Sequence, residues 1–413
     1  MNPTSQLPAR TLEALLLLAL SVALACGEDP DAAANEAPPT WATEPEYSFG
    51  DSPEREVFFM APEVRADPAR GRVFAVDRPN HQVSAWTPKG TLLFRLGQKG
   101  EGPGEFMRIG SLHIEMDGTF KVQEDGRGRY TRYTAQGELV GTTAGPPPVS
   151  YQGLPVDLHW PAEGSYLGTP SIPDVLESGS MGFAPVTRTP VLRVRDLGDG
   201  RWSEPEPLLW MDIGNRTHSV AIPQPGGVDG AIVGSQPFGD PDHVRIEPGA
   251  AVLIRSKGKP GTVELIEVDA SGDTAWHRLV ELTPRRLTSA MVQEVEEREM
   301  EFLAQHAPPG TPTARLRRGF YEGLYQPEYL PPTEGPPLLT ASGEVWMRTT
   351  EVLDSLRVYY AVPRGDPTGT LRRVLLPQAF WITDATATHV WGVQWDSMDR
   401  PHVVGRRLLP SPG

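Results

Sequence analysis

The sequence of 413 residues contains a single cysteine, Cys26, so no disulfide can form within the chain. It also lacks an excess of basic residues: 38 Lys and Arg stand against 53 Asp and Glu, and the formal net charge is −15. Nucleic-acid binding needs a basic surface that neutralises phosphates, so we expect no nucleic-acid partner. Hydrophobic residues at 38% and charged residues at 22% exclude a protein that crosses a membrane several times.

Long apolar runs are scarce as well. Residues 14–25 (ALLLLALSVALA) form an apolar run of 12 residues, too short to cross a bilayer core of about 30 Å as a helix. Arg10 precedes this run, small residues close it, and Cys26 follows at once. This order predicts a secretory signal peptide over residues 1–25.

The tetrapeptide Ala23-Leu24-Ala25-Cys26 resembles the lipobox of bacterial lipoproteins, with the usual order of the first two residues exchanged. The resemblance implies that the thiol of Cys26 receives a diacylglycerol. It places the protein at the bacterial cell envelope, lipid-anchored on the periplasmic or extracellular side of a membrane. The alternative is an ordinary cleaved signal peptide followed by a chance cysteine. Residues 26–44 are rich in Ala, Pro and acid, which predicts a flexible tether behind the lipidated cysteine.

Short β-like runs separated by turn residues fill the rest of the chain. The chain has 42 Gly and 44 Pro, about a fifth of its residues, which favours many short strands joined by turns. Within residues 57–97, the runs REVFF, RVFAVD, QVSAWT and TLLFRLG predict four strands. Residues 111–143 repeat the pattern with a period close to 40, which is typical of propeller blades.

The later blades are longer and looser. We draw them over residues 154–211, 218–283, 326–376 and 379–409, with the outer strand of the last blade supplied by residues 45–50. Residues 284–305 predict one inserted helix, with Thr283 as its N-cap. The predicted fold is therefore all-β, a six-bladed β-propeller over residues 45–409, with seven blades as the fallback.

The segment RGRVFAVDRPNHQVSAWTPKGTLLFRLGQKGEGPGEF (70–106) resembles the NHL-type repeat of six-bladed propellers. Fourteen residues carry the resemblance: Gly71, Val73, Ala75, Asp77, Asn80, Val83, Gly90, Gly97, Gly100, Gly102, Pro103, Gly104, Glu105 and Phe106. The match is specific over about 40 residues and fades through the second blade. Because NHL-type propellers often serve as interaction platforms, the resemblance implies such a role here.

Familiar catalytic motifs are missing: there is no GxSxG, HExxH or Walker loop, and no GxGxxG after a strand. We therefore predict no catalytic residue. His113 and His159 begin comparable strands of adjacent blades and are weak candidates for holding a metal, zinc or calcium, on the propeller axis. The simpler interpretation is two unrelated strand histidines without any cofactor.

Other distinctive residues are assigned structural roles. Asp77 and Asn80 are expected to close a turn through side-chain hydrogen bonds, and Gly102, Pro103 and Gly104 to form a loop between blades. Trp381, Trp391 and Trp395 fall in one blade, where such side chains pack between sheets or form an aromatic binding surface.

The leading functional hypothesis is a non-enzymatic platform for an envelope protein or a glycan. The alternatives are a metal-dependent propeller enzyme, similar to lactonases or lyases, and a sensor that binds a small ligand. The fold alone does not separate them.

Overall fold

The computed structural model describes residues 38–50, 59–60, 62–125, 129–162, 164–173, 176, 185–223, 229–256 and 258–410. The chain divides into two units, Met1–Pro39 and Thr40–Gly413, and the folded body lies in the second. Cys26 and the predicted signal peptide fall outside the described residues. No helix among the described residues is long and apolar enough to cross a membrane.

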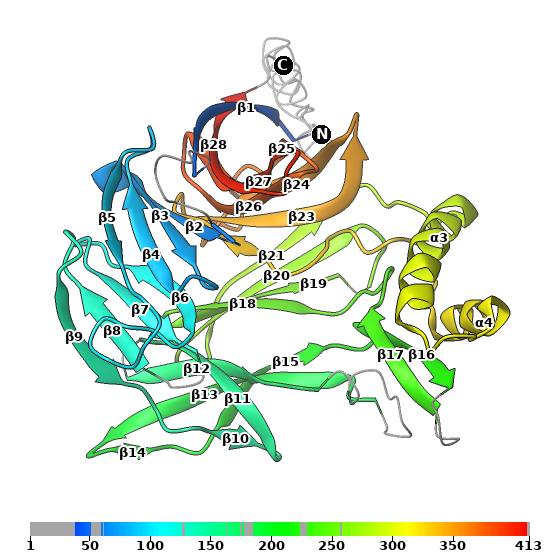
Figure 1. The fold of residues 1–413 in the computed structure, drawn as a ribbon, viewed down its shortest axis with the longest axis horizontal. Coiled ribbons are helices and arrows are strands. Elements are labelled where there is room, and N and C mark those ends of the chain that lie inside the picture. Colours follow the sequence, from blue (N-terminus) through cyan, green and yellow to red (C-terminus); the bar gives the residue numbers. More distant parts are fainter. Residues whose placement is uncertain are drawn as a thin grey trace, which may run out of the picture. The chain divides into compact units, whose positions relative to one another are not determined.

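Two four-stranded antiparallel sheets open the body (Figure 1). The first contains β2 (Pro62–Asp67), β3 (Arg72–Asp77), β4 (Gln82–Trp86) and β5 (Leu92–Leu96). The second contains β6 (Ile109–Ile114), β7 (Phe120–Glu124), β8 (Arg129–Tyr133) and β9 (Leu139–Ala144). Tight turns join their strands, as the repeat predicted.

The first strand differs from the prediction. The inner strand of the first sheet is β2, PEVRAD, and not REVFF, whose residues 55–58 lie outside the described part. Val64 and Ala66 of β2 are buried in the core between sheets, while Glu63 and Arg65 alternate with them. These charged residues interrupt the apolar pattern, and no strand was predicted over this segment.

The third sheet is larger and more irregular. Its main strands are β11 (Leu154–Ala162), β12 (Ser165–Pro170), β13 (Arg188–Gly198) and β15 (Glu206–Asp212), joined by the two-residue strands β10 (Ser150–Tyr151) and β14 (Arg201–Trp202). The four main strands match the runs predicted from the sequence over 154–211.

The fourth sheet corrects the prediction. It consists of β18 (His243–Glu247), β19 (Ala250–Arg255), β20 (Thr262–Asp269) and β21 (Thr274–Glu281). The run AIVGSQ, predicted as part of this sheet, belongs instead to a separate hairpin of β16 (Thr217–Pro223) and β17 (Asp229–Ser235).

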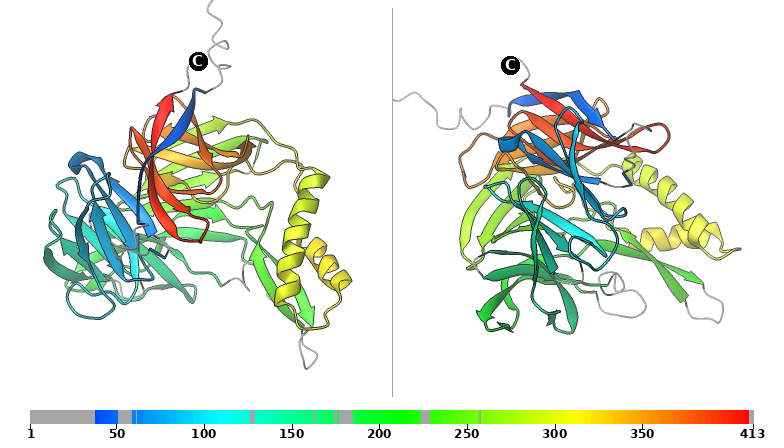
Figure 2. Two further views of the ribbon diagram at one scale, coloured as in Figure 1. Left: turned by 45° about the horizontal axis from the view of Figure 1, so that its top comes forward. Right: turned by 60° about the vertical axis from the view of Figure 1, so that its left-hand side comes forward.

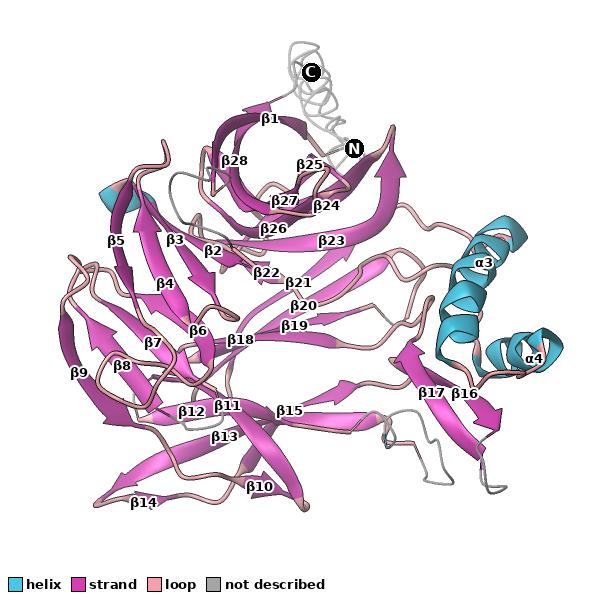
Figure 3. Cartoon of the chain, in the orientation of Figure 1, coloured by secondary structure: helices cyan, strands magenta, loops and turns pink. Residues whose placement is uncertain are grey.

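Two helices accompany this hairpin, where the sequence predicted one. Helix α3 (Ser289–His306) begins after Thr288, whose side chain accepts a hydrogen bond from the Met291 N–H, and not after Thr283. Helix α4 (Thr313–Gly323) was not predicted. Figure 3 shows both helices beside the hairpin. Val220, Leu303 and Phe320 belong to a buried cluster that joins the three elements.

The first and last described strands of the chain pair within an eight-stranded sheet. Half of it contains β22 (Leu338–Leu339), β23 (Glu344–Leu353), β24 (Leu356–Pro363) and β25 (Arg372–Pro377). The other half contains β26 (Phe380–Ala385), β27 (His389–Trp395), β28 (Pro401–Pro410) and β1 (Thr40–Phe49). The antiparallel pairing of β1 with β28 confirms the predicted closure by the N-terminal strand. β1 begins at Thr40, within the segment expected as tether.

Hydrophobic clusters lie between successive sheets of the body. Phe74 packs with Phe120 between the first two sheets, and Trp86 packs with Trp391 between the first sheet and the last. Further buried clusters join the third sheet to the fourth and the fourth to the β22–β25 half. Figures 1 and 2 show the sheets arranged around a common centre. The body is therefore an all-β, propeller-like arrangement with two added helices.

Candidate functional site

A cavity of about 970 Å³ lies where the first strands of the sheets converge. Its lining includes residues of β2, β6, β11, β18, β22 and β26, which come from five different sheets. Successive residues of a strand point to opposite faces, so alternate residues of each strand reach the same side. The cavity thus collects side chains that are far apart in the sequence.

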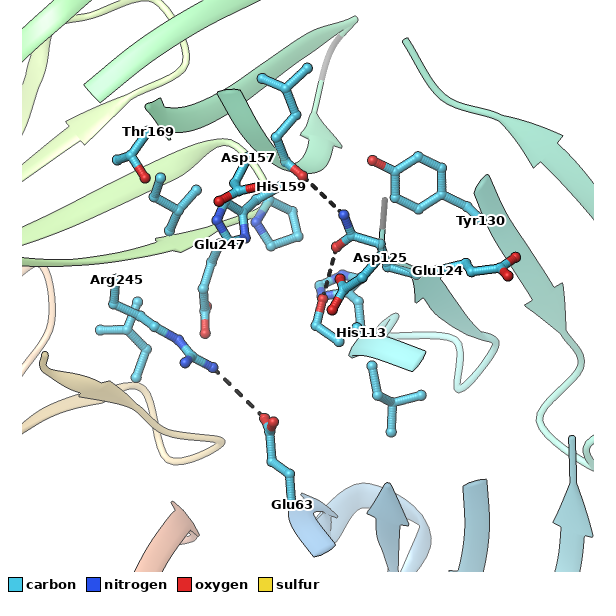
Figure 4. A pocket seen from close by; sticks show the side chains of 18 of the residues that line it. Glu63, His113, Glu124, Asp125, Tyr130, Asp157, His159, Thr169, Arg245 and Glu247 are labelled. Carbon is cyan, nitrogen blue, oxygen red and sulfur yellow. Dashed lines mark hydrogen bonds and ion pairs between the residues drawn. The ribbon is translucent and has the colours of Figure 1, made fainter. Parts of the chain in front are cut away.

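Four of these strands each contribute a pair of polar side chains at alternate positions. The pairs are Glu63 and Arg65 on β2, Ser111 and His113 on β6, Asp157 and His159 on β11, and Arg245 and Glu247 on β18. In Figure 4, Glu63, His159, Arg245 and Glu247 face the same space. The cavity therefore presents both hydrogen-bond donors and acceptors.

Glu63 is the centre of an arginine cluster. Arg65 Nε donates to Glu63 Oε1 over 3.0 Å, and Arg78 Nη2 donates to Glu63 Oε2 over 2.5 Å. Arg245 Nη2 lies 3.9 Å from Glu63 Oε1, an ion pair longer than a hydrogen bond. Burial opposes ionisation of Glu63, but the charges of Arg65 and Arg78 outweigh it and lower its pKa to about 2. Glu63 is therefore ionised at neutral pH.

Both histidines that the sequence singled out line this cavity. Burial lowers the pKa of His113, although the charges of Glu115 and Glu247 oppose the shift. Burial, followed by the charge of Arg245, lowers the pKa of His159. Neutral imidazole both donates and accepts hydrogen bonds, which suits a polar ligand.

The predicted metal role of the two histidines stays a prediction. Among the described residues, no group of three or more His, Cys, Asp or Glu side chains is placed to hold a metal ion. His113 Nε2 lies 3.6 Å from a carboxylate oxygen of Glu115, an arrangement between residues two apart on the chain.

Polar side chains that join neighbouring strands complete the wall. Gln123 Nε2 donates to the carbonyl oxygen of Leu158 over 2.9 Å, and Ser111 Oγ donates to Gln123 Oε1 over 3.0 Å. These bonds fix Gln123 between the second and third sheets. Asp125 also lines the cavity, and burial raises the pKa of its carboxyl.

The remaining sequence candidates lie outside the cavity. Asn80 Nδ2 donates to Asp77 Oδ2 over 2.7 Å in the turn after β3. The backbone N–H of Gly102 donates to Glu105 Oε2 over 2.8 Å in the loop that contains Pro103 and Gly104. Cys26 is outside the described residues.

A glycine of the same repeat has a clear steric role. Gly97 has a φ of +85°, and a Cβ there would lie 2.6 Å from the carbonyl oxygen of His81. The close approach of two backbone segments explains glycine at this position.

The three tryptophans of the last sheet separate into two environments. Trp391 is buried and stacks on Tyr47, with 5.9 Å between ring centroids. Trp381 and Trp395 are 58% and 41% exposed. Only Trp391 therefore follows the expected packing between sheets.

Sequence reasoning missed Glu63, Arg245 and Glu247. The signal that could have found them is the alternation of polar residues along the first strand of each sheet: ExR on β2, SxH on β6, DxH on β11 and RxE on β18. In an ordinary half-buried strand, such alternating polar residues lie on the face exposed to solvent. The pattern alone therefore does not predict a cavity.

No protein-family profile and no curated protein matches the chain. Solved structures are similar to it over most of its length at low identity. A member of the DUF4221 family from Bacteroides vulgatus is 8% identical, with a TM-score of 0.44, over 89% of this chain and 98% of that one. A virginiamycin B lyase from Staphylococcus aureus, catalytically inactive and with quinupristin, is 10% identical, with a TM-score of 0.38, over 88% and 99%. A calcium-binding regucalcin from Agrobacterium tumefaciens is 10% identical, with a TM-score of 0.35, over 90% and 97%. At such low similarity, no activity or ligand is transferred from these proteins to this chain.

Proposed function

We propose that this chain is an envelope-anchored binding protein whose propeller takes a small glycan into its central cavity without chemically changing it. The observation that carries the proposal is the cavity of about 970 Å³ with its pairs of polar side chains. That volume is at the upper end of ordinary small-molecule pockets and is large enough for a disaccharide. Sugar hydroxyls donate and accept hydrogen bonds, as do the side chains that line the wall.

The count of six blades is part of this proposal. Six of the strands that line the cavity, β2, β6, β11, β18, β22 and β26, are each followed along the chain by further strands of one antiparallel run. The eight-stranded sheet then corresponds to two blades, joined where β25 and β1 pair in parallel over Thr40 and Trp41. Further support comes from the NHL-type repeat over residues 70–106.

Anchoring rests on the lipobox-like residues that end at Cys26. A diacylglycerol with a further acyl chain gives durable membrane attachment, at about 0.8 kcal/mol for each buried CH₂. Substitution Cys26→Ser is expected to move the protein from the membrane fraction to the soluble fraction of its bacterium. Unchanged membrane retention would contradict the lipoprotein assignment.

Binding in the cavity is tested with the processed chain, from residue 26 and carrying Cys26→Ser. The probes for isothermal titration calorimetry are glucose, N-acetylglucosamine, glucuronate and galacturonate, each as a monosaccharide and a disaccharide. We expect at least one of these sugars to bind, and Val156→Trp to abolish its binding because Val156 lines the cavity.

The matched control is Val140→Trp on β9, where the side chain is 55% exposed and far from the cavity lining. Binding should survive this substitution. Failure of all probes to bind, or equal binding by both tryptophan variants, would overturn the proposed function.

The second candidate function is a metal-dependent enzyme, favoured by the shared position of His113 and His159 in the cavity. Metal analysis of the protein purified without chelator tests it. About one equivalent of zinc or calcium, lost in the double variant His113→Ala and His159→Ala, would support this candidate.

A further inference from the structure

Arg245 is the arginine of the Glu63 cluster that makes no hydrogen bond to the Glu63 carboxylate. Its Nε is buried and has no hydrogen-bond partner among the described residues. Its nearest carboxylate contact is the 3.9 Å ion pair with Glu63. Burial, together with the charge of Arg65, lowers the pKa of Arg245. The Arg245 guanidinium therefore has N–H groups that can still donate hydrogen bonds to a ligand.

The other arginines of the cluster are already bonded. Arg65 donates to Glu63 through Nε, and its Nη2 lies 2.9 Å from the same carboxylate oxygen. Arg78 donates to the second oxygen of Glu63 and to the carbonyl oxygen of Gly110. Both carboxylate oxygens of Glu63 therefore already accept hydrogen bonds from arginines other than Arg245.

The acid on the same strand, Glu247, has a different arginine beside it. Glu247 follows Arg245 on the same strand, and Arg364 Nη1 lies 3.8 Å from its carboxylate. Arg364 itself is held by two hydrogen bonds to Glu267, of 2.8 and 2.9 Å. Arg245 thus has no hydrogen-bonded carboxylate among the described residues, although Arg108 and the acids Asp125 and Asp157 also line the cavity.

Asp384, the remaining acid beside Arg65, has other partners. Its carboxylate accepts hydrogen bonds from the backbone N–H groups of Ala66, Ala341 and Ala385. Burial raises the pKa of this carboxyl, so the surroundings do not favour its charge. These hydrogen bonds join neighbouring segments of the backbone. Among the described residues, Asp384 makes no hydrogen bond to Arg245.

We propose that the glycan carries a carboxylate, as a uronic acid does, and that this carboxylate pairs with Arg245 inside the cavity. The inference rests on the proposed function and names the ligand class of the same site. A single guanidinium without a hydrogen-bonded carboxylate fits a monoanion better than a phosphate ester, which carries a charge of about −1.5 to −2 at pH 7, because the acids that share the lining repel the higher charge more strongly. Arginine suits a planar carboxylate because its N–H groups form a matching fork.

The test compares glucose, glucuronate and glucose 6-phosphate by isothermal titration calorimetry with the processed Cys26→Ser chain. Glucuronate differs from glucose only at C6, so the pair isolates the carboxylate. We expect glucuronate to bind about tenfold or more tightly than glucose, and more tightly than glucose 6-phosphate. Substitution Arg245→Gln should remove the preference for glucuronate while leaving weak binding of the sugar.

The matched control is Arg195→Gln, because Arg195 is half exposed, pairs with Glu206 and does not line the cavity. It should keep the full preference. Equal binding of glucose and glucuronate, a preference for the phosphate ester, or a preference that survives Arg245→Gln would overturn the inference. These outcomes leave the cavity as a sugar site, whereas the failure of every sugar to bind would remove the proposed function itself. Circular dichroism spectra that match wild type would show that the variants are folded.

Discussion

Two arginine–carboxylate groups, each with its carboxylate on strand β2, show how the same residue types can serve opposite purposes. Arg72 Nε donates to Asp67 Oδ2 over 2.9 Å, and its other nitrogens donate to the carbonyl oxygens of Gly118 and Ala135. Both side chains of the Arg72–Asp67 pair are about 5% exposed. In the cavity, by contrast, Arg245 approaches Glu63 without a hydrogen bond. A closed pair stabilises the fold, whereas an open one is available for binding.

The closed pair should give the largest change in stability. Substitution Arg72→Met leaves the buried Asp67 carboxylate with only the longer, 3.4 Å contact to Arg70 Nη1, and it removes the link to the second sheet. We expect a loss of about 3 kcal/mol or more in the free energy of unfolding, measured by urea denaturation. Arg95→Met, at an exposed position of β5, is the control and should change little. Equal losses for the two variants would contradict the special role of the closed pair.

The second largest effect should be a loss of stability at acid pH, caused by protonation of Glu63 in the cavity. The pKa of Glu63 is lowered to about 2 in the folded protein, against an ordinary value near 4.5. Its stabilising contribution is therefore fully present above about pH 4.5 and is lost as the pH falls towards 2. The difference corresponds to about 3 kcal/mol at most.

Urea denaturation of wild type and Glu63→Gln between pH 7 and pH 3 measures this effect. The stability gap between the two proteins should be widest at neutral pH and narrow steadily below pH 4.5. A gap that stays constant over this range would show that Glu63 is not held ionised by the arginines.

Arg245→Gln should change stability far less than Arg72→Met. Its guanidinium has no hydrogen bond to lose to Glu63, and its removal relieves repulsion from Arg65. We expect a change within about 1 kcal/mol in the free energy of unfolding. A loss as large as that of Arg72→Met would show that Arg245 is a structural residue.

An exposed ion pair should show the smallest effect on stability. Lys259 Nζ lies 2.8 Å from Glu281 Oε1, and both side chains are more than 70% exposed. Lys259→Gln should leave the midpoint of thermal unfolding nearly unchanged, because exposed ion pairs are screened by water and contribute little to stability. A clear drop in the midpoint would mean that charge in general, and not closure, sets the stability.

The sequence predicted those parts of the fold in which strands follow one another through short turns. The sheets over residues 62–144 have local patterns of period 2 and turn residues at each end. Strand β2 was missed because Glu63 and Arg65 interrupt its apolar pattern, although they face a cavity and not solvent. The residues of β17 were predicted as a strand but assigned to the fourth sheet, and helix α4 was missed. The hairpin and this helix pack on each other although they are distant in the sequence.

The candidate site was harder to predict than the fold. His113 and His159 could be singled out because histidine between apolar residues is unusual on a strand. Arg245 and Glu247 could not, since they become neighbours of Glu63 only when β18 and β2 converge. A single sequence does not show which charged residues face the axis of the sheets.

A crystal structure of the processed Cys26→Ser chain soaked with glucuronate tests the central claim most directly. We predict density for the sugar in the central cavity, with its carboxylate about 3 Å from the guanidinium of Arg245. Density for the sugar elsewhere on the molecule, or in the cavity with its carboxylate turned away from Arg245, would contradict the account.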